Sequence, residues 1–333
     1  MTTMTQLLSE KAEMTQTTDA PEQTLQLEIV AVDRLTDDVV QLRLRAPDGS
    51  PLPAWSPGAH LDLVLEGVGP RQYSLCSDPT KPGEWRVAVL REPDGRGGSA
   101  YVHDRLVPGQ SVTVQGPRNH FRLVEAPHYT FVAGGIGITP LLPMIRHAER
   151  AGVPWRLHYG GRTRATMAYV DELVERYGDR ISLCPQETHG LLDLAGILAD
   201  APEGSRVYCC GPEPLLAALE GACAERELPT PHVERFAPKD LGETHDVDFE
   251  VELESTGEVV AVPAGCSVLE ALRQHGLDVP SSCQEGTCGT CETEVVEGEI
   301  DHRDSVLDPE EQESGEVMMV CVSRCRGSRL VLD

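Results

Sequence analysis

Three cysteines lie close together near the C-terminal end of the sequence, in the stretch SSCQEGTCGTC. Cys283, Cys288 and Cys291 have the spacing C-x4-C-x2-C, and Cys321 follows after 29 residues, at the end of the apolar stretch VMMVC. Four cysteines with this spacing hold the cluster of plant-type [2Fe–2S] proteins. Two glycines within the loop would let the backbone come close to such a cluster, so that free N–H groups reach its sulfides. The sequence therefore predicts an iron–sulfur site here.

The alternatives are a zinc site, a disulfide framework and chance. A zinc ribbon uses two separated C-x2-C pairs, and the loop contains one. Disulfides are rare in cytoplasmic proteins. Cys325 lies four residues beyond Cys321 and is a second candidate for the fourth ligand; we prefer Cys321 because it ends the apolar strand. The cysteines outside the constellation are expected to be small buried hydrophobes: Cys76, Cys184, Cys209, Cys223 and Cys266.

A glycine-rich turn, FVAGGIGITP, joins an apolar strand to a helical stretch. Helix N-termini bind phosphate through free N–H groups and the helix dipole, and we expect Thr139 to cap this helix with Pro140 in its first turn. Pro140 stands where G-x-G-x-x-G has its third glycine, so a plain strand–helix turn is the alternative. A later strand ends in VYCCGP, and parallel-sheet ligands collect at such strand ends. Cys210 is thus expected in the same crevice, where a nucleophilic role would need a His or Asp partner that is not evident.

A third motif, RQYSL, lies in a predicted strand. Arg71 offers a planar fork for phosphate, Tyr73 a ring for stacking and Ser74 a hydroxyl donor. The stretch GRGGS, residues 95–99, precedes a helix and can form a second anion nest. Taken singly, each could be an ordinary strand or turn.

These motifs require different units to position them. Residues 24–125 contain short segments such as LQLEIVAV and EWRVAVLRE, separated by turns, which predicts an antiparallel β-barrel. In residues 126–236 strands alternate with helices, which predicts a parallel α/β sheet. Residues 237–247 form a polar linker with Pro and Gly, and residues 248–333 a small α+β unit. Residues 1–23 are predicted to be a disordered tail.

Acidic residues set the charge of the chain. The formal net charge is −26, and residues 246–333 contain 21 acidic and 5 basic residues, a net charge of −16. This charge argues against nucleic acid as a partner. The chain has no apolar run long enough for a transmembrane helix and no signal peptide, so a cytoplasmic protein is expected. The acidic C-terminal unit serves either solubility or the docking of a partner protein.

In combination, R-x-Y-S, G-x-x-S, GGIGITP and CGP, followed by the cysteine loop, resemble the phthalate dioxygenase reductase and vanillate demethylase reductase family. HRD (302–304) and CVSR (321–324) are similar to that family as well. The resemblance covers residues 25–333, with the domains in the same order. It implies a multidomain α+β and α/β chain: an antiparallel flavin-binding β-barrel, a parallel-sheet nicotinamide-binding domain and a C-terminal β-grasp ferredoxin domain.

The resemblance also implies roles for residues of the barrel. Arg71 and Gln72 would approach the flavin phosphate, Tyr73 would pack on the isoalloxazine, and Ser74 would lie near its reactive nitrogen. Further barrel residues are implied to line the flavin or hold its phosphate: Ala88, Val89, Leu90, Gly97, Gly98 and Ser99.

The second domain is implied to complete both sites. Thr139 would touch the flavin, and Gly135 and Gly137 would lie by the dinucleotide. Cys210 would lie near the nicotinamide. Phe236, in ERF, is similar to the aromatic residue that covers the exposed flavin face.

The resemblance implies an enzyme that passes electrons from NADH through FMN and a [2Fe–2S] cluster to a Rieske-type oxygenase or demethylase. GRGGS and the following helix favour FMN, whereas broader relatives use FAD. Arg162 and Arg164 could meet the 2′-phosphate of NADPH, or belong to a solvated loop. A haem-thiolate monooxygenase is the alternative partner. The intact motifs argue against a non-catalytic binding module, and a monomer is expected.

Overall fold

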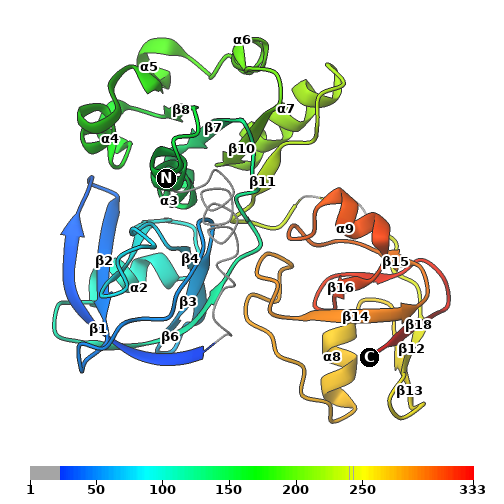
Figure 1. Cartoon of the computed structure of the whole chain (residues 1–333). Coiled ribbons are helices and arrows are strands. Elements are labelled where there is room, and N and C mark those ends of the chain that lie inside the picture. The colour runs from blue at the N-terminus through cyan, green and yellow to red at the C-terminus, as the bar shows by residue number, and fades with distance from the viewer. Residues whose placement is uncertain (1–22, 240, 243) are drawn as a thin grey trace, which may run out of the picture.

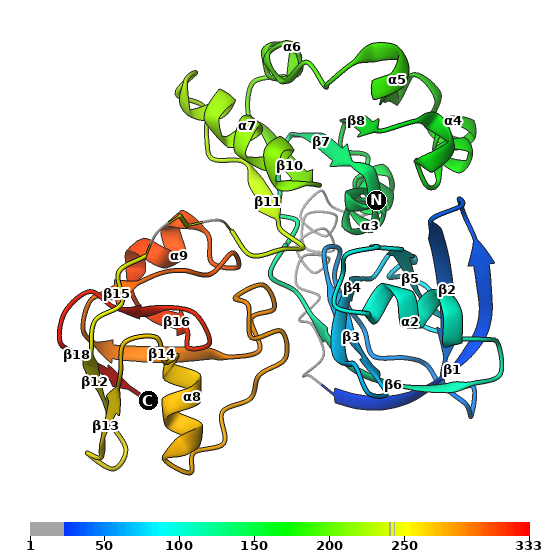
Figure 2. The same ribbon diagram turned by 180° about the vertical axis from the view of Figure 1, so that it is seen from behind.

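The computed structural model describes residues 23–239, 241–242 and 244–333. Figures 1 and 2 show three sheet-based units: a barrel, a parallel-sheet unit and a mixed-sheet unit that contains the C-terminus. The sequence predicted these three architectures in this order. The expected tail, residues 1–23, lies outside the described residues except for Gln23, which is the first residue of strand β1.

The barrel is a sheet of six antiparallel strands in the order β4-β3-β6-β1-β2-β5. A bridge between Leu75 and Val87 brings its two edges together, so the sheet is nearly closed. Leu42 and Leu44 are buried while Arg43 between them is not, the period of two expected of a strand with one face in a core. The elements are β1 (Gln23–Arg34), β2 (Val39–Arg45), β3 (His60–Leu65), β4 (Gly69–Ser74), β5 (Trp85–Leu90), α2 (Gly98–Arg105) and β6 (Ser111–Arg118).

The parallel-sheet unit has the strand order β11-β10-β7-β8-β9. Strand β7 is buried along almost its whole length, as expected where helices cover both faces of a parallel sheet. The strands are β7 (His128–Gly134), β8 (Trp155–Gly161), β9 (Ile181–Pro185), β10 (Ser205–Cys210) and β11 (His232–Glu234). The α-helices are α3 (Ile138–Ala151), α4 (Val170–Tyr177), α5 (Gln186–His189), α6 (Leu194–Asp200) and α7 (Glu213–Ala224).

The mixed-sheet unit has the strand order β13-β12-β18-β14-β16, in which only β12 and β18 pair in parallel. Helix α8 packs on this sheet through Val268, Leu269 and Leu272, the β-grasp arrangement. The elements are β12 (Phe249–Leu253), β13 (Val259–Val262), α8 (Val268–Gln274), β14 (Glu292–Glu297), β15 (Ile300–Asp301), α9 (Pro309–Ser314), β16 (Val317–Met319), β17 (Arg324–Cys325) and β18 (Arg329–Leu332).

Two local expectations were wrong. Helix α3 starts at Ile138, directly after the 3-10 turn η1 (Gly135–Gly137), so Thr139 lies inside the helix and does not cap it. Its hydroxyl donates instead to the Ile136 carbonyl at 3.0 Å. Cys184 and Cys266 are half-exposed rather than buried.

Across the described residues, no helix combines the length and the apolar character needed to cross a membrane.

Candidate functional site

The cysteine loop, residues 281–291, carries three of the predicted ligands. Backbone N–H groups of Glu285 and Thr287 point at the Cys283 sulfur, at 3.3 and 3.4 Å, and the Thr290 N–H points at the Cys288 sulfur at 3.4 Å. N–H groups aimed at sulfur stabilise thiolates and the sulfides of a cluster, and they lower its electron density. The loop backbone is therefore arranged as an anion-stabilising cradle.

Tertiary folding adds the fourth thiol to the loop. Contacts with Cys288 and Cys321 lower the pKa of Cys283, and contact with Cys321 lowers the pKa of Cys291. Cys325 points elsewhere, because its thiol donates to the Arg329 carbonyl at 3.4 Å. The structure therefore brings Cys321 to the loop thiols, and its role as the fourth ligand stays a prediction.

The loop glycines fill places where a side chain cannot fit. Gly286 has φ +68°, and a Cβ atom there would lie 2.6 Å from the Val322 side chain. No three His, Cys, Asp or Glu side chains in the described part of the chain converge on one metal-ion position. A two-iron cluster held by four cysteines does not need such convergence. The donor set thus fits a [2Fe–2S] group.

The residues expected to form the barrel site come together where strand β4 meets the start of α2. Arg71 donates to the Arg96 carbonyl at 3.1 Å and lies across Gly98, where a Cβ atom would be 2.5 Å from Arg71 Cγ. Gly97 has φ +84°, and no side chain caps the N-terminus of α2. Gln72 Nε2 is buried and has no hydrogen-bond partner among the described residues. This orphaned donor and the uncapped helix end fit a phosphate-bearing ligand.

Other barrel residues differ in what they can offer a ligand. Val89 is 1% exposed and packs in the barrel core, so its side chain is not available, and its carbonyl oxygen lies 3.0 Å from His103 Nε2. Ala88 and Leu90 pack on the opposite side, against the parallel-sheet unit. The Ser99 hydroxyl accepts a hydrogen bond from the Glu92 N–H at 3.0 Å. Burial raises the pKa of Tyr73 to about 12, so its hydroxyl stays protonated.

The two strand-end turns of the parallel-sheet unit touch each other. A Cβ atom on Gly137 would lie 2.1 Å from the Cys210 carbonyl oxygen, and one on Gly134 would lie 2.7 Å from Pro212. Gly135, in contrast, has φ +55° with nothing within 4 Å of a Cβ position. The glycines therefore permit close packing on one side and leave open space on the other.

A carboxyl group that the sequence analysis did not identify joins the barrel to this crevice. Ser74 Oγ donates to Glu234 Oε2 at 3.3 Å, and Cys210 Sγ lies 3.9 Å from the same oxygen. Burial raises the pKa of Glu234 to about 8. Burial and the neighbouring Glu234 raise the pKa of Cys210 well above its ordinary value, so this thiol is not an activated nucleophile.

Glu234 left one weak signal in the sequence, an acidic residue two positions before Phe236 in ERF. Phe236 itself is 48% exposed, at the end of the parallel-sheet unit. Its ring is therefore available to cover a ligand.

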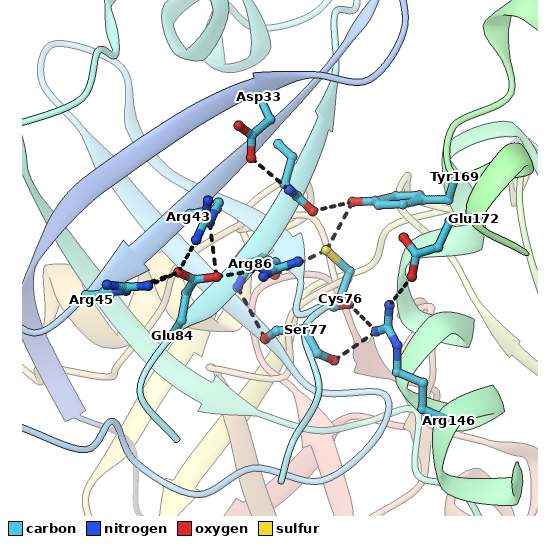
Figure 3. Close-up of polar contacts among 11 residues, drawn as sticks. Asp33, Arg43, Arg45, Cys76, Ser77, Glu84, Arg86, Arg146, Tyr169 and Glu172 are labelled. Carbon is cyan, nitrogen blue, oxygen red and sulfur yellow. Dashed lines mark hydrogen bonds and ion pairs between the residues drawn. The ribbon is translucent and has the colours of Figure 1, made fainter. Parts of the chain in front are cut away.

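The barrel and the parallel-sheet unit are also joined by a second, larger set of polar contacts (Figure 3). We call this set the latch; it consists of the contacts that Tyr169 and Arg146 make with Gln41, Cys76 and Ser77. The Tyr169 hydroxyl donates to Gln41 Oε1 at 3.1 Å and lies 3.4 Å from the Cys76 sulfur. Tyr169 has φ +63°, a strained conformation for a non-glycine residue. Strain of this kind persists only where surrounding contacts fix the residue.

Arg146 of helix α3 completes the latch. Its guanidinium group donates to the carbonyl oxygens of Cys76 at 2.6 Å and Ser77 at 3.1 Å, directly after the RQYSL strand. Helix α3 begins at the glycine-rich turn, so the contacts of Arg146 fix this turn relative to the segment that follows β4.

On its other side the barrel meets the cysteine loop. Arg96 pairs with Glu285 at 2.8 Å, and the Thr287 hydroxyl lies 3.5 Å from Gln72 Oε1. The ring of His120 lies against Gly289, where a Cβ atom would be 2.0 Å from Nε2. Arg96, His120 and Gln72 were not assigned to this contact from the sequence, because it depends on docking between distant segments.

Comparison with known proteins gives matches along nearly the whole chain. Residues 251–326 match the family model of the 2Fe-2S iron-sulfur cluster binding domain. Phenoxybenzoate dioxygenase subunit beta of Ectopseudomonas oleovorans is 46% identical over 309 residues, with 92% of this chain and 96% of that protein covered.

Two solved structures are similar over 93% of this chain. One is phthalate dioxygenase reductase, described as a modular structure for electron transfer from pyridine nucleotides to [2Fe–2S]. It is 36% identical, has 98% of its chain covered and gives a TM-score of 0.68. The other is an intact type IV self-sufficient cytochrome P450 monooxygenase, 42% identical, with 41% of its chain covered and a TM-score of 0.88.

Proposed function

The chain belongs to the family of phthalate dioxygenase reductase and related oxygenase reductase subunits, and from this we propose how its three units divide the work. It is an oxidoreductase, the reductase component of an oxygenase system, in which electrons pass from a pyridine nucleotide to a [2Fe–2S] centre. In the proposed division, residues 24–125 bind FMN, residues 126–236 bind NADH, and residues 248–333 hold the cluster and serve a terminal oxygenase.

One observation carries the proposal: a single strand touches both neighbouring units. Gln72 of β4 lies 3.5 Å from Thr287 of the cysteine loop, and Ser74 bonds Glu234 of the parallel-sheet unit at 3.3 Å. Residues two apart in a strand point to the same face. A flavin held along this strand would therefore adjoin the hydride donor on one side and the electron acceptor on the other.

FMN fits the residues around β4. The orphaned Gln72 amide, the Arg71 guanidinium and the uncapped α2 start offer donors to a phosphate group. FMN, when bound, supplies the ability to accept two electrons as a hydride and to release them one at a time. The task of the protein is to position the flavin and to tune its potential. FAD remains the alternative, and we favour FMN by resemblance.

We propose that NADH lies over the contacting turns, with Gly135 open to the dinucleotide and Cys210 packing by the nicotinamide as a neutral thiol. The surroundings of the loop after β8 favour NADH over NADPH. The guanidinium group of Arg164 pairs with Asp171 at 2.7 Å, and the backbone N–H of Arg164 donates to Glu187 Oε1 at 3.1 Å. A 2′-phosphate would meet these two carboxylates as well as the arginine.

We propose a Rieske-type oxygenase as the partner and a monomeric reductase in the cytoplasm. Residues 246–333, with a net charge of −16, would attract a basic patch on that partner. A haem-thiolate monooxygenase is the second candidate, because the self-sufficient cytochrome P450 contains a segment similar to nearly this whole chain. Reconstitution with each kind of oxygenase separates the two.

The test of the proposed function is anaerobic titration with NADH and, in parallel, with NADPH. We expect NADH at low concentration to bleach a flavin and then give the rhombic EPR signal of a reduced [2Fe–2S] cluster. Denaturation should release FMN. Absence of the rhombic signal in iron-loaded protein, or release of a different cofactor, would overturn the corresponding part of the proposal.

A further inference from the structure

Two motifs of the mixed-sheet unit, HRD (302–304) and CVSR (321–324), lie against each other in the structure. The Arg303 N–H donates to Ser323 Oγ at 3.1 Å, and the Ser323 hydroxyl donates to Asp304 Oδ1 at 3.4 Å. The Asp304 carboxylate also accepts two backbone N–H groups of the turn that follows, at 2.8 and 3.1 Å. Asp304 and Ser323 are both buried. This buried network fixes the conformation of residues 302–305, which we call the HRDS segment.

The HRDS segment holds the cysteine loop at the point where the loop meets the barrel. The Ser305 N–H donates to the Gly286 carbonyl oxygen at 2.8 Å. Gly286 also packs on the backbone of the segment, since a Cβ atom there would lie 3.0 Å from Asp304 Cα. The two chain neighbours of Gly286 are Glu285 and Thr287, which contact the barrel. A shift of the HRDS segment would therefore move this contact.

The same segment holds the linker, residues 237–247. The Lys239 N–H donates to Ser305 Oγ at 2.9 Å, and further along the linker Asp246 pairs with Arg303 at 2.7 Å. Ser305 thus binds the linker through its hydroxyl and the cysteine loop through its backbone N–H. A single residue therefore connects these two segments.

The linker in turn follows a residue that is bound to the barrel. Glu234, shortly before Lys239 in the chain, accepts a hydrogen bond from Ser74 of β4 at 3.3 Å. Gln72 of the same strand lies 3.5 Å from Thr287 of the cysteine loop. The contacts therefore form a closed ring, which leaves β4 at Ser74 and returns to it at Gln72. Such a ring restricts where the loop lies relative to β4, because a short tether raises the effective concentration of the groups that it joins.

We propose that Ser305 is a positioning residue for electron transfer from the flavin to the cluster, because it ties the linker to the cysteine loop and so sets where the loop meets β4. The inference rests on the proposed function, in which one electron passes from the reduced flavin to the oxidised cluster. Without the Ser305 hydroxyl, the tether that begins at Phe236 extends beyond Lys239. Each doubling of a short flexible tether lowers the effective concentration of the loop at the barrel about threefold.

The experiment removes the hydroxyl alone. Ser305→Ala takes away the acceptor of the Lys239 N–H and keeps the backbone N–H that holds Gly286. Ser305→Thr keeps a hydroxyl and is the conservative rescue. Ser314→Ala is the matched control, because the Ser314 hydroxyl donates to the Glu311 carbonyl oxygen at 2.8 Å within the same unit. In each holoprotein, stopped flow with NADH measures flavin and cluster reduction, and amide hydrogen exchange measures the attachment of the linker.

We expect cluster reduction in Ser305→Ala to follow flavin reduction at least about threefold more slowly than in wild type. The Lys239 amide hydrogen should exchange about fivefold faster, as the loss of one hydrogen bond implies. Flavin reduction by NADH, the EPR g-values and the midpoint potential of the cluster should match wild type, and the other two variants should match it throughout.

Three results for Ser305→Ala would overturn the inference: cluster reduction at the wild-type rate, unchanged exchange of the Lys239 amide, or a loss of rate together with a shifted EPR spectrum or midpoint potential. In the last case the substitution would act on the cluster itself instead of on its position. If NADH reduces neither flavin nor cluster in the wild-type holoprotein, the proposed function has failed instead, and the exchange comparison still tests the contact between Lys239 and Ser305.

A second variant lengthens the tether and leaves Ser305 intact. Insertion of Gly-Ser-Gly between Pro238 and Lys239 doubles the tether from Phe236 to the Ser305 contact, so flavin-to-cluster transfer should slow about threefold. The EPR spectrum and the rate of flavin reduction by NADH should not change. A wild-type rate of cluster reduction in this variant would show that the tether does not position the loop, and the inference would fall.

Discussion

The barrel has two interfaces, and they differ in how firmly they are held. Toward the parallel-sheet unit it is fixed by the latch, where Arg146 donates to two backbone carbonyl oxygens and the strained Tyr169 bonds Gln41. Its contacts toward the cysteine loop include one exposed ion pair, one long contact, a ring packed on glycine and the buried His60, which lies close to Cys283 and the Cys288 backbone. The difference matches the two transfers proposed here. A hydride moves only between atoms held about 3–3.5 Å apart, whereas a single electron does not need that contact.

The largest effect is expected for Cys321→Ser, which should abolish electron delivery through the cluster and leave hydride transfer to the flavin intact. Cys321→Ser removes one thiolate of the cluster, so the rhombic EPR signal should vanish and electron delivery to cytochrome c should fall by on the order of 100-fold, beyond what an outer-shell change costs. Flavin reduction by NADH, measured by stopped flow, should be unchanged, because it depends on the latch interface. Cys325→Ser is the matched control and should keep the EPR signal. If Cys325→Ser loses the signal and Cys321→Ser keeps it, Cys325 is the fourth ligand instead of Cys321.

The next variant, Arg146→Ala, removes the latch contacts of helix α3. Arg146→Ala leaves the buried carbonyl groups of Cys76 and Ser77 without their donor, which should lower the free energy of unfolding by about 1–3 kcal/mol. Flavin reduction should slow by about 10- to 100-fold, since small displacements have large effects on hydride transfer. Flavin-to-cluster transfer should change little.

Arg150→Ala is the control for this variant, one helical turn further along α3. Arg150 pairs with Asp78 at 2.9 Å and is 40% exposed, so its loss should cost at most about 1 kcal/mol. Equal effects of the two substitutions would mean that the latch does not set the hydride geometry.

Glu234 gives the firm interface a pH dependence. Its pKa is raised to about 8 from an ordinary 4.5, so the folded protein binds a proton that the unfolded chain has lost, and stability falls as pH rises between these values. Glu234→Gln should remove this loss, which is on the order of a few kcal/mol at pH 9. Thermal unfolding at pH 5 and 9 measures it, with the exposed Glu225→Gln as the control. Parallel pH slopes for Glu234→Gln and wild type would show that this carboxyl ionises normally.

The same contrast shows what the sequence could and could not predict. The barrel, the parallel sheet and the cysteine set follow from local periodicity and spacing, and Cys321 was preferred over Cys325 on the strand pattern alone. Strand β11 was missed because three residues carry no recognisable period. Glu234, Tyr169 and His120 were missed because each acts through one tertiary contact and belongs to no motif.

The Thr139 cap shows a different kind of failure. Sequence rules place a capping threonine before a proline at the helix start. Here the 3-10 turn of Gly135–Gly137 runs directly into α3, so the helix begins two residues earlier than the rule expects. The close packing of Gly137 on the Cys210 carbonyl selects this geometry, and such packing cannot be read from a local pattern.

The smallest expected effect tests the weak interface. Glu285→Gln keeps the size of the side chain and removes its charge opposite Arg96, so the unfolding free energy should change by less than about 0.5 kcal/mol. Flavin-to-cluster transfer should slow by a few-fold at low ionic strength and match wild type near 0.5 M salt, because exposed charges are screened within a few ångströms there. The control is Glu297→Gln, an exposed carboxylate on β14 of the same unit. A salt-independent loss of rate in Glu285→Gln would mean that the docking is fixed by packing rather than by charge, and the two interfaces would then be alike in kind.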